Sequence, residues 1–214
     1  MKRKFKLAVF DLDGTLTKER SVWEFIHKRI GKWHTVGQKY EMQFLNKEIS
    51  YHEFCRLDAQ VWKGMTVEKL ETIVASVPFY RGIDTLALYL NNHGIKIALI
   101  SSGLSILANM VKERYNFDYA VANDLLYDNA ILTGEVRINV YSDKKAQWVS
   151  RIMSRYGIER EETIAIGDSL GDKELFQTAG FSVAFNPSYT ELDSIADVVV
   201  HSDDISDIIP KLPF

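Results

Sequence analysis

Two aspartates one residue apart follow an apolar run near the N-terminus. The run covers residues 6–10 (KLAVF), and Asp11 and Asp13 come directly after it. A short continuous apolar run is typical of a buried parallel strand, and ligands in open α/β sheets bind just beyond the carboxyl ends of such strands. We therefore expect a functional site at Asp11 and Asp13, with a simple polar turn as the alternative.

Further polar groups stand where later apolar runs end. Ser101-Ser102 follows a second strand-like run, Asp168 follows another, and the pair Lys144-Lys145 opens a helical segment between them. Such a set suits phosphoryl transfer, which needs a nucleophile, a divalent cation, donors for the phosphate oxygens and a proton donor for the leaving group. Carboxylates are hard oxygen ligands of the kind that Mg2+ prefers. The sequence therefore indicates a phosphoryl-transfer site that binds Mg2+.

Strand-like and helical segments alternate from Arg81 to the C-terminus. The expected segments are a helix ending at Gly94, a strand at 95–100, a helix at 105–114, a strand at 119–122, a hairpin at 125–134 with Asp128-Asn129 at its tip, a helix at 144–155, a strand at 163–166, a helix at 172–179, and strands at 181–184 and 198–200. Strands that alternate with helices predict a parallel sheet covered on both faces. The expected fold class is α/β, with a Rossmann-like core and a β-hairpin.

Residues 18–77 show no strand pattern and place their apolar residues at helical spacing. Ser50 and Thr66 are expected to cap the third and fourth helices of this segment. Pro78 marks the return to the alternating pattern. The predicted domains are a discontinuous core of residues 1–17 and 78–214 and an all-helical insert of residues 18–77.

Composition narrows the class of partner. The chain has 214 residues and a net charge of -3, from 26 basic and 29 acidic residues, which gives no electrostatic reason to expect a nucleic-acid or membrane partner. Its single cysteine, Cys55, cannot form an internal disulfide, as is typical of a reducing compartment. The N-terminal apolar run is too short for a membrane span or an export signal. We expect a cytoplasmic protein that acts on a small molecule.

The motifs resemble those of the haloacid dehalogenase superfamily of aspartate-nucleophile phosphatases. Four of them occur in the family's order: Asp11-Leu12-Asp13-Gly14-Thr15, Ser101, Lys144 or Lys145, and Gly167-Asp168-Ser169-Leu170-Gly171-Asp172. The resemblance implies that Asp11 attacks phosphorus and forms an aspartyl-phosphate. It also implies that Asp13 protonates the leaving group and then activates water, for which its pKa should be raised.

The same resemblance implies the remaining roles. Mg2+ would be bound by Asp11, Asp168 and the backbone carbonyl of Asp13, and Asp172 would support the metal waters or the lysine. Lys145 fits the family's helix pattern slightly better than Lys144, and both remain candidates.

Phosphate contacts are expected just beyond the second strand. Ser101 would bind phosphate, and Ser102 and Gly103 would offer backbone donors, with helix capping as the alternative for the two serines.

The helical insert and hairpin resemble the phosphoserine-phosphatase branch of this superfamily, yet two positions differ. Arg20 stands where that branch has a glutamate for the substrate amino group, and Asp58 stands where it has a cap arginine for the carboxylate. Both recognition charges would then be reversed, which disfavours an amino-acid head group. Arg20 and Asp58 could instead pair with each other and leave a site for a neutral polyol or sugar phosphate, with phosphoserine as another candidate.

The resulting functional hypothesis is a Mg2+-dependent phosphomonoesterase that acts through an aspartyl-phosphate on a small phosphorylated metabolite. One alternative is a phosphotransferase that passes the same phosphoryl group to an alcohol. Another is a phosphorylatable signalling module of the receiver type, which also combines an aspartate, a hydroxyl residue and a lysine around Mg2+. The sequence leaves the oligomeric state open.

Overall fold

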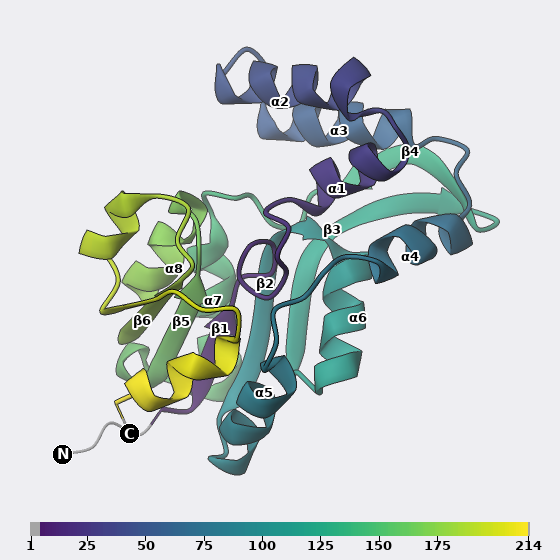
Figure 1. Cartoon of the computed structure of the whole chain (residues 1–214). Coiled ribbons are helices and arrows are strands. Elements are labelled where there is room, and N and C mark those ends of the chain that lie inside the picture. Colours follow the sequence, from purple (N-terminus) through teal and green to yellow (C-terminus); the bar gives the residue numbers. More distant parts are fainter. Residues whose placement is uncertain (1–4, 214) are drawn as a thin grey trace.

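The computed structural model describes residues 5–213, in which seven strands form one sheet of order β4-β3-β2-β1-β5-β6-β7. All neighbours pair in parallel except β3 and β4, which form an antiparallel hairpin (Figure 1). The strands are β1 (Leu7–Phe10), β2 (Lys96–Leu104), β3 (Tyr119–Asp128), β4 (Ile131–Arg137), β5 (Thr163–Gly167), β6 (Phe181–Phe185) and β7 (Val198–Val200). The predicted α/β class is confirmed.

Strand β1 lies between β2 and β5, and all four of its residues are buried. Its side chains alternate between two faces, so Ala8 and Phe10 belong to one hydrophobic cluster while Leu7 and Val9 belong to another. Because both faces are apolar, the strand reads as a continuous hydrophobic run. For this reason the apolar run at residues 6–10 was sufficient to predict strand β1.

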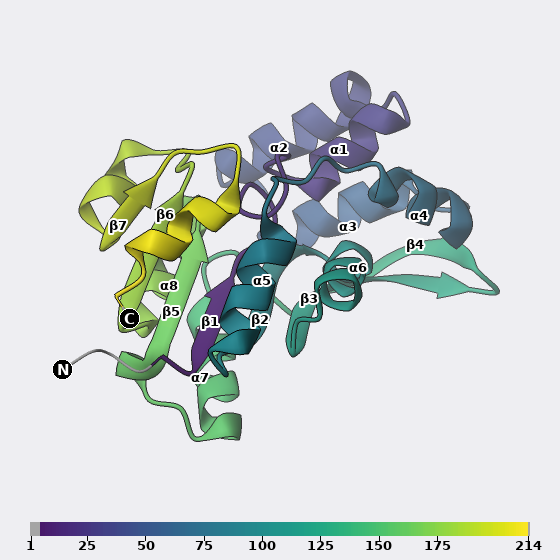
Figure 2. The ribbon, with the colours of Figure 1, turned by 60° about the horizontal axis from the view of Figure 1, so that its bottom comes forward.

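Helices cover both faces of the sheet (Figures 1 and 2). The cluster around Phe10 contains residues of α5 (Ile83–Asn92) and α6 (Ser105–Tyr115). The cluster around Val9 contains residues of α7 (Lys145–Tyr156) and α8 (Lys173–Thr178). The short 3-10 helices are η2 (Arg160–Glu162), η3 (Leu170–Asp172), η4 (Thr190–Ser194) and η5 (Ile205–Lys211). No helix within residues 5–213 is long and apolar enough to cross a membrane.

The segment between β1 and α5 is helical. Its elements are α1 (Val22–Arg29), the π-helix η1 (Trp33–Gly37), α2 (Gln38–Leu45), α3 (Tyr51–Val61) and α4 (Val67–Ala75). Helices α1, α2 and α3 lie in the upper part of Figure 1, and α4 lies beside α6. Ser50 Oγ accepts the Glu53 amide at 3.1 Å and Thr66 Oγ1 accepts the Lys69 amide at 3.2 Å, so both predicted caps are present.

The hairpin differs from the expectation. The predicted strand at 119–122 and hairpin arm from 125 form one strand, β3, and the turn residues are Asn129 and Ala130 instead of Asp128-Asn129. Both turn residues have positive φ, 47° and 63°, as a tight turn between twisted strands requires. The pairing of β3 with β4 has a register shift between Leu125 and Tyr127.

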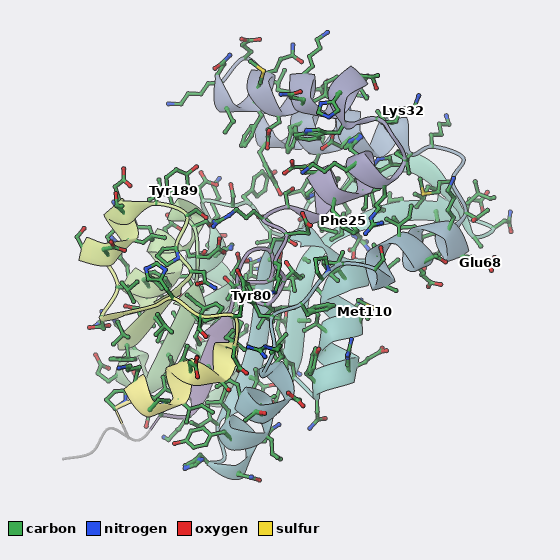
Figure 3. The ribbon with its side chains drawn as sticks, viewed as in Figure 1. Phe25, Lys32, Glu68, Tyr80, Met110 and Tyr189 are labelled. Carbon is green, nitrogen blue, oxygen red and sulfur yellow. The ribbon has the colours of Figure 1, made fainter. Side chains whose placement is uncertain are left out.

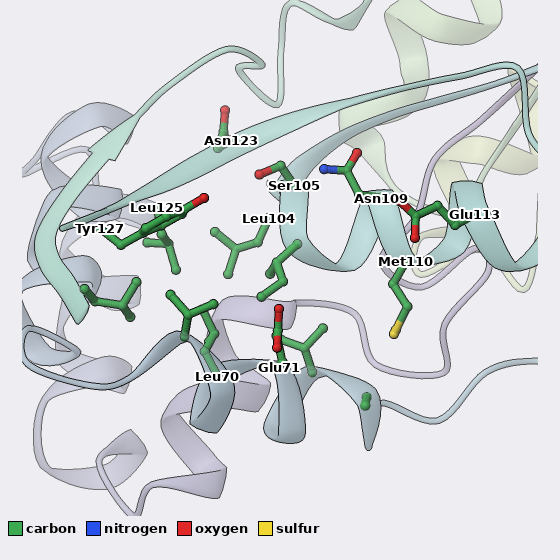
Figure 4. Close-up of a pocket in the computed structure, with 15 residues that line it drawn as sticks. Leu70, Glu71, Leu104, Ser105, Asn109, Met110, Glu113, Asn123, Leu125 and Tyr127 are labelled. Carbon is green, nitrogen blue, oxygen red and sulfur yellow. The ribbon is translucent and has the colours of Figure 1, made fainter. Parts of the chain in front are cut away.

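A cavity of about 470 Å³ lies between α4, α6 and the hairpin (Figure 4). Its wall is largely apolar, with Leu70 from α4, Met110 from α6 and Leu125 from β3. None of the predicted phosphoryl-transfer residues lines it. The candidate site therefore lies elsewhere, at the carboxyl edge of the sheet.

Candidate active site

A cavity of about 300 Å³ lies between the carboxyl edge of the sheet and the helical insert. Phe10 of β1 pairs with Leu99 of β2 and Ile166 of β5, which brings the ends of the three strands together. Most of the predicted site residues line this cavity: Asp11, Asp13, Arg20, Ser101, Ser102, Gly103, Lys145 and Asp168. Asp58 does not line this cavity.

Lys145 joins two carboxylates at the base of the site. Its Nζ lies 2.7 Å from Asp11 Oδ1 and 2.7 Å from Asp172 Oδ1, and all three side chains are buried. Burial alone would lower the pKa of Lys145, but the two carboxylates outweigh it and the pKa is raised. Lys144 is exposed, and its Nζ lies over the Tyr141 ring, 5.2 Å from the centroid. Only Lys145 of the two reaches the nucleophile candidate.

Asp11 and Asp13 both bind protons more tightly than ordinary carboxyls. Burial and the charge of Asp172 raise the pKa of Asp11 to about 6, against the opposing effect of Lys145. Burial and the charge of Asp11 raise the pKa of Asp13 to about 7. Asp13 Oδ1 is buried without a hydrogen-bond partner among the described residues. An acid with this pKa and a free oxygen suits proton transfer to and from a substrate near neutral pH.

The last residues of β2 have a geometry that sequence could not specify. Ser101 is buried within β2, and its Oγ accepts the Gly103 amide at 2.9 Å. Neither serine caps α6, whose first turn has no side-chain cap. A Cβ at Gly103 would overlap the Asp13 carboxylate, so glycine is required for the close approach of the end of β2 to the loop after β1.

The Ser102 carbonyl connects the helical insert to the end of β2. It accepts hydrogen bonds from Trp23 Nε1 of α1 at 3.3 Å, Tyr51 Oη of α3 at 2.7 Å and Asn123 Nδ2 of β3 at 2.8 Å. Sequence analysis assigned none of these three residues to the site. Tyr51 and Trp23 carried no signal beyond helical spacing, because the contact depends on how the insert docks.

Asp168 is held at the mouth of the site by three donors. Its Oδ1 accepts from Thr15 Oγ1 at 3.0 Å, and its Oδ2 accepts from Ser188 Oγ at 3.1 Å and Arg20 Nη1 at 3.3 Å. A Cβ at Gly14, whose φ is +85°, would overlap the Asp168 carboxylate. The sequence analysis did not identify Ser188. It lies three residues after β6, beyond the carboxyl end of a strand, and this position was the available signal.

Three buried carboxylates form a candidate cation site. Asp11, Asp168 and Asp172 each offer an oxygen, and these atoms lie within 4.8 Å of one another. Burial, with Asp172 and Asp11 nearby, raises the pKa of Asp168 to about 8. Asp172 Oδ2 already accepts the amides of Asp168 and Ser169 at 3.1 and 3.0 Å, and its Oδ1 binds Lys145. Hard oxygen donors and unbalanced negative charge fit Mg2+, with Asp11 and Asp168 as the accessible ligands.

Arg20 and Asp58 do not pair with each other, which corrects one expectation. Arg20 contacts Asp168 instead. Asp58 is 1% exposed and lies 2.8 Å from Nε2 of His27, which is itself buried, beside the stacked rings of Trp23 and Trp62. Burial raises the pKa of Asp58, and the hydrogen bond to His27 opposes this effect. Asp58 is therefore part of the interior of the insert and does not contact a ligand in the cavity.

Replacing Asp58 with Ala is expected to destabilise the protein without changing substrate affinity. Removing one partner of a buried polar pair costs about 3 to 5 kcal/mol, or on the order of 10 °C in Tm for a chain of this size. Thermal melts and KM for a phosphate ester measure the two effects. Glu53→Ala is the matched control, because Glu53 forms an exposed pair with Arg56 on the same helix and should leave Tm nearly unchanged. A raised KM with unchanged Tm would contradict the structural role of Asp58.

Comparison with known proteins defines the class. The sequence model of the haloacid dehalogenase-like hydrolase family matches residues 8–177 of this chain. The chain belongs to this family, and within it to the phosphoserine-phosphatase-like branch. The protein is an enzyme, a phosphoric monoester hydrolase.

Individual relatives place it more closely. The phosphoserine phosphatase of Methanocaldococcus jannaschii is 29% identical over 98% of this chain and 98% of that protein. That of Archaeoglobus fulgidus is 30% identical over 99% of this chain, which spans 61% of that protein. A solved phosphoserine phosphatase, described as a phospho-aspartyl intermediate analogue, superposes with a TM-score of 0.83 at 27% identity and covers 98% of this chain and 99% of that one.

Proposed function

We propose that the protein is a Mg2+-dependent phosphomonoesterase that acts through an aspartyl-phosphate on a small phosphate ester. The observation that carries this proposal is the arrangement of Asp11, Asp13 and Lys145 in one cavity. Lys145 orients and balances the ionised Asp11, while Asp13 keeps a proton in the same neutral pH range. A nucleophile beside a separate proton donor suits the cleavage of a phosphate ester.

The chemistry takes two displacements at phosphorus. In the first, an Asp11 oxygen forms a bond to phosphorus as the bond to the leaving oxygen breaks, and Asp13 donates its proton to that oxygen. In the second, Asp13 takes a proton from water, whose oxygen attacks phosphorus and releases Asp11 and inorganic phosphate. Lys145 remains paired with Asp11 and Asp172 and offsets charge that builds up at phosphorus.

Mg2+ would be held by Asp11, Asp168 and the backbone carbonyl of Asp13, with Asp172 in support. When bound, it would neutralise phosphate charge and so ease attack by a carboxylate. Thr15 and Ser188 hold Asp168 in place through hydrogen bonds, so these hydroxyls would support a metal ligand.

Mg2+ is expected to stabilise the protein more at pH 8 than at pH 6. The pKa values of Asp11, Asp13 and Asp168, about 6, 7 and 8, lie above the 3.8 of an ordinary Asp. The folded metal-free protein therefore binds these protons more tightly than the unfolded chain, and this contribution to stability is lost as pH rises from about 4 through 8. At 100 times its dissociation constant, a ligand adds about 2.7 kcal/mol, or on the order of 5 to 10 °C in Tm.

Thermal melts with Mg2+ or with Na+ of equal ionic strength, at both pH values, measure this coupling. The Asp168→Asn variant serves as the site control and should lose most of the Mg2+ response. An equal Mg2+ shift at both pH values would contradict the linkage between these carboxyls and the cation.

The helical segment 18–77 is proposed to act as a cap over a core formed by residues 1–17 and 78–214. Its hydrogen bonds to the Ser102 carbonyl, from Trp23 and Tyr51, support a closed arrangement that excludes water from the site. Phosphoserine, the substrate in the name of the relatives, is a candidate substrate on their account.

Phosphate release in the presence of Mg2+ tests the proposal. Nitrophenyl phosphate serves as a general ester, and an acid quench with labelled substrate should trap a phosphoryl group at Asp11 that hydroxylamine removes. Release of phosphate without a trapped enzyme species would contradict the covalent route. Transfer to an added alcohol in place of water would favour a phosphotransferase, and a stable phospho-enzyme without turnover would favour a signalling module.

A further inference from the structure

The end of the catalytic cavity that faces the insert is built from aromatic rings. Trp23 of α1, Phe44 of α2, and Tyr51 and Phe54 of α3 all line it. The rings of Phe44 and Phe54 stack at 5.2 Å with an interplanar angle of 11°, and Phe44 lies 5.7 Å from Tyr51. Tyr189 lines the cavity from the core, on the segment after β6 (Figure 3). Every helix of the insert that faces this cavity therefore contributes an aromatic side chain.

The charged side chains that line this cavity come from the carboxyl edge of the sheet, the start of α7 and the loop after β1. Its carboxylates are Asp11, Asp13 and Asp168, which are the proposed catalytic and metal groups. Its cations are Lys145, paired with Asp11, and Arg20, paired with Asp168. Among the described residues that line it, no carboxylate comes from the insert, residues 18–77.

An ammonium group on the substrate would find no carboxylate from the insert to pair with in this cavity. Glu24 and Glu53, which adjoin Trp23 and Phe54 in sequence, pair with Lys28 and Arg56 and do not line the cavity. Asp58 is enclosed in the insert with His27 and does not line it either. A charged group taken out of water without a partner binds poorly. An uncharged group that packs on aromatic faces therefore fits these rings better than the ammonium group of an esterified amino acid.

We propose that the preferred substrate is a phosphate monoester of an uncharged alcohol that carries one planar ring. This inference rests on the proposed phosphomonoesterase function and names the substrate class of the same site. A volume of about 300 Å³ stands at the low end for ligand sites, which suits a phosphate with one ring-sized group. The ring lies against Phe44, Phe54 and Trp23 while the phosphate meets Asp11.

Competing esters of unactivated alcohols provide the test, because their leaving groups differ little in reactivity. We expect kcat/KM for benzyl phosphate to exceed that for glycerol phosphate by about 10-fold, the effect of one favourable aromatic contact. It should exceed that for phosphoserine by about 100-fold, since phosphoserine adds an unpaired ammonium. Nitrophenyl phosphate, measured alongside, reports general phosphatase activity.

The variant Phe44→Leu removes one ring and keeps an apolar side chain. It is expected to lower the ratio of kcat/KM for benzyl phosphate to that for glycerol phosphate about 5-fold. This ratio is independent of how much enzyme is folded, and Phe54→Leu repeats the test on α3. Tyr127→Leu is the matched control, because Tyr127 is exposed on the hairpin and outside this cavity (Figure 4), and it should leave the ratio unchanged.

Three results would overturn different parts of the proposal. Hydrolysis of nitrophenyl phosphate with phosphoserine as the best substrate would overturn the substrate class and leave the proposed phosphatase intact. If Phe44→Leu and Phe54→Leu leave the ratio of kcat/KM for benzyl phosphate to that for glycerol phosphate unchanged, the aromatic rings do not select the substrate. Absence of Mg2+-dependent hydrolysis of every ester would overturn the proposed function, and the substrate class with it.

Discussion

Replacing Asp11 with Asn is expected to lower turnover of any phosphate ester by about 10⁴-fold or more. The amide oxygen of asparagine is a poor nucleophile toward phosphorus, and loss of a covalent nucleophile removes both displacements at once. The substitution also removes the charge that faces Lys145 Nζ at 2.7 Å. Phosphate release at saturating Mg2+ measures the loss, and no phosphoryl-enzyme should be trapped by an acid quench.

Two controls make this result specific to the nucleophile. Asp128→Asn makes the same chemical change at an exposed position of the hairpin and should retain full activity. A thermal melt of Asp11→Asn separates loss of chemistry from loss of fold. Activity near that of the wild type at added Mg2+ would show that the aspartyl-phosphate route is wrong.

Replacing Lys145 with Ala is expected to reduce both activity and stability. Its ammonium lies 2.7 Å from Asp11 Oδ1 and from Asp172 Oδ1 and is only 2% exposed. Removing it leaves two buried carboxylates without their shared cation, which costs about 3 to 5 kcal/mol of stability. The loss of a fixed charge beside the reacting phosphoryl group lowers kcat by about 10²- to 10³-fold.

Lys144→Ala is the matched control, one residue away in sequence. Lys144 is exposed and its Nζ lies over the Tyr141 ring, so this change should leave kcat and Tm close to those of the wild type. Together the two variants decide which lysine serves the phosphate. Loss of activity in Lys144→Ala with a normal Lys145→Ala would reverse the assignment made from the geometry.

Much of the fold was predictable because its signals are local. β1 is recognisable as a continuous apolar run, since both of its faces are buried, and the change to helical spacing after residue 17 marks the insert. Asp11, Asp13 and Asp168 follow strand ends, and parallel neighbours in a sheet bring such ends together without further information. The hairpin was less predictable, because Asn123-Asp124 resembles a break while its side chains instead bond neighbouring backbone and side-chain groups.

The sequence by itself determined the α/β class, the order of the motifs and the strand ends that carry carboxylates, because each depends on apolar pattern within one element. Only the tertiary structure decided that Lys145 and not Lys144 reaches Asp11, since adjacent residues at a helix start point in different directions. It also decided that Asp58 binds His27 within the insert while Arg20 meets Asp168. These contacts depend on how the elements pack in three dimensions, and that packing brings together side chains far apart in the chain, for which no local pattern exists.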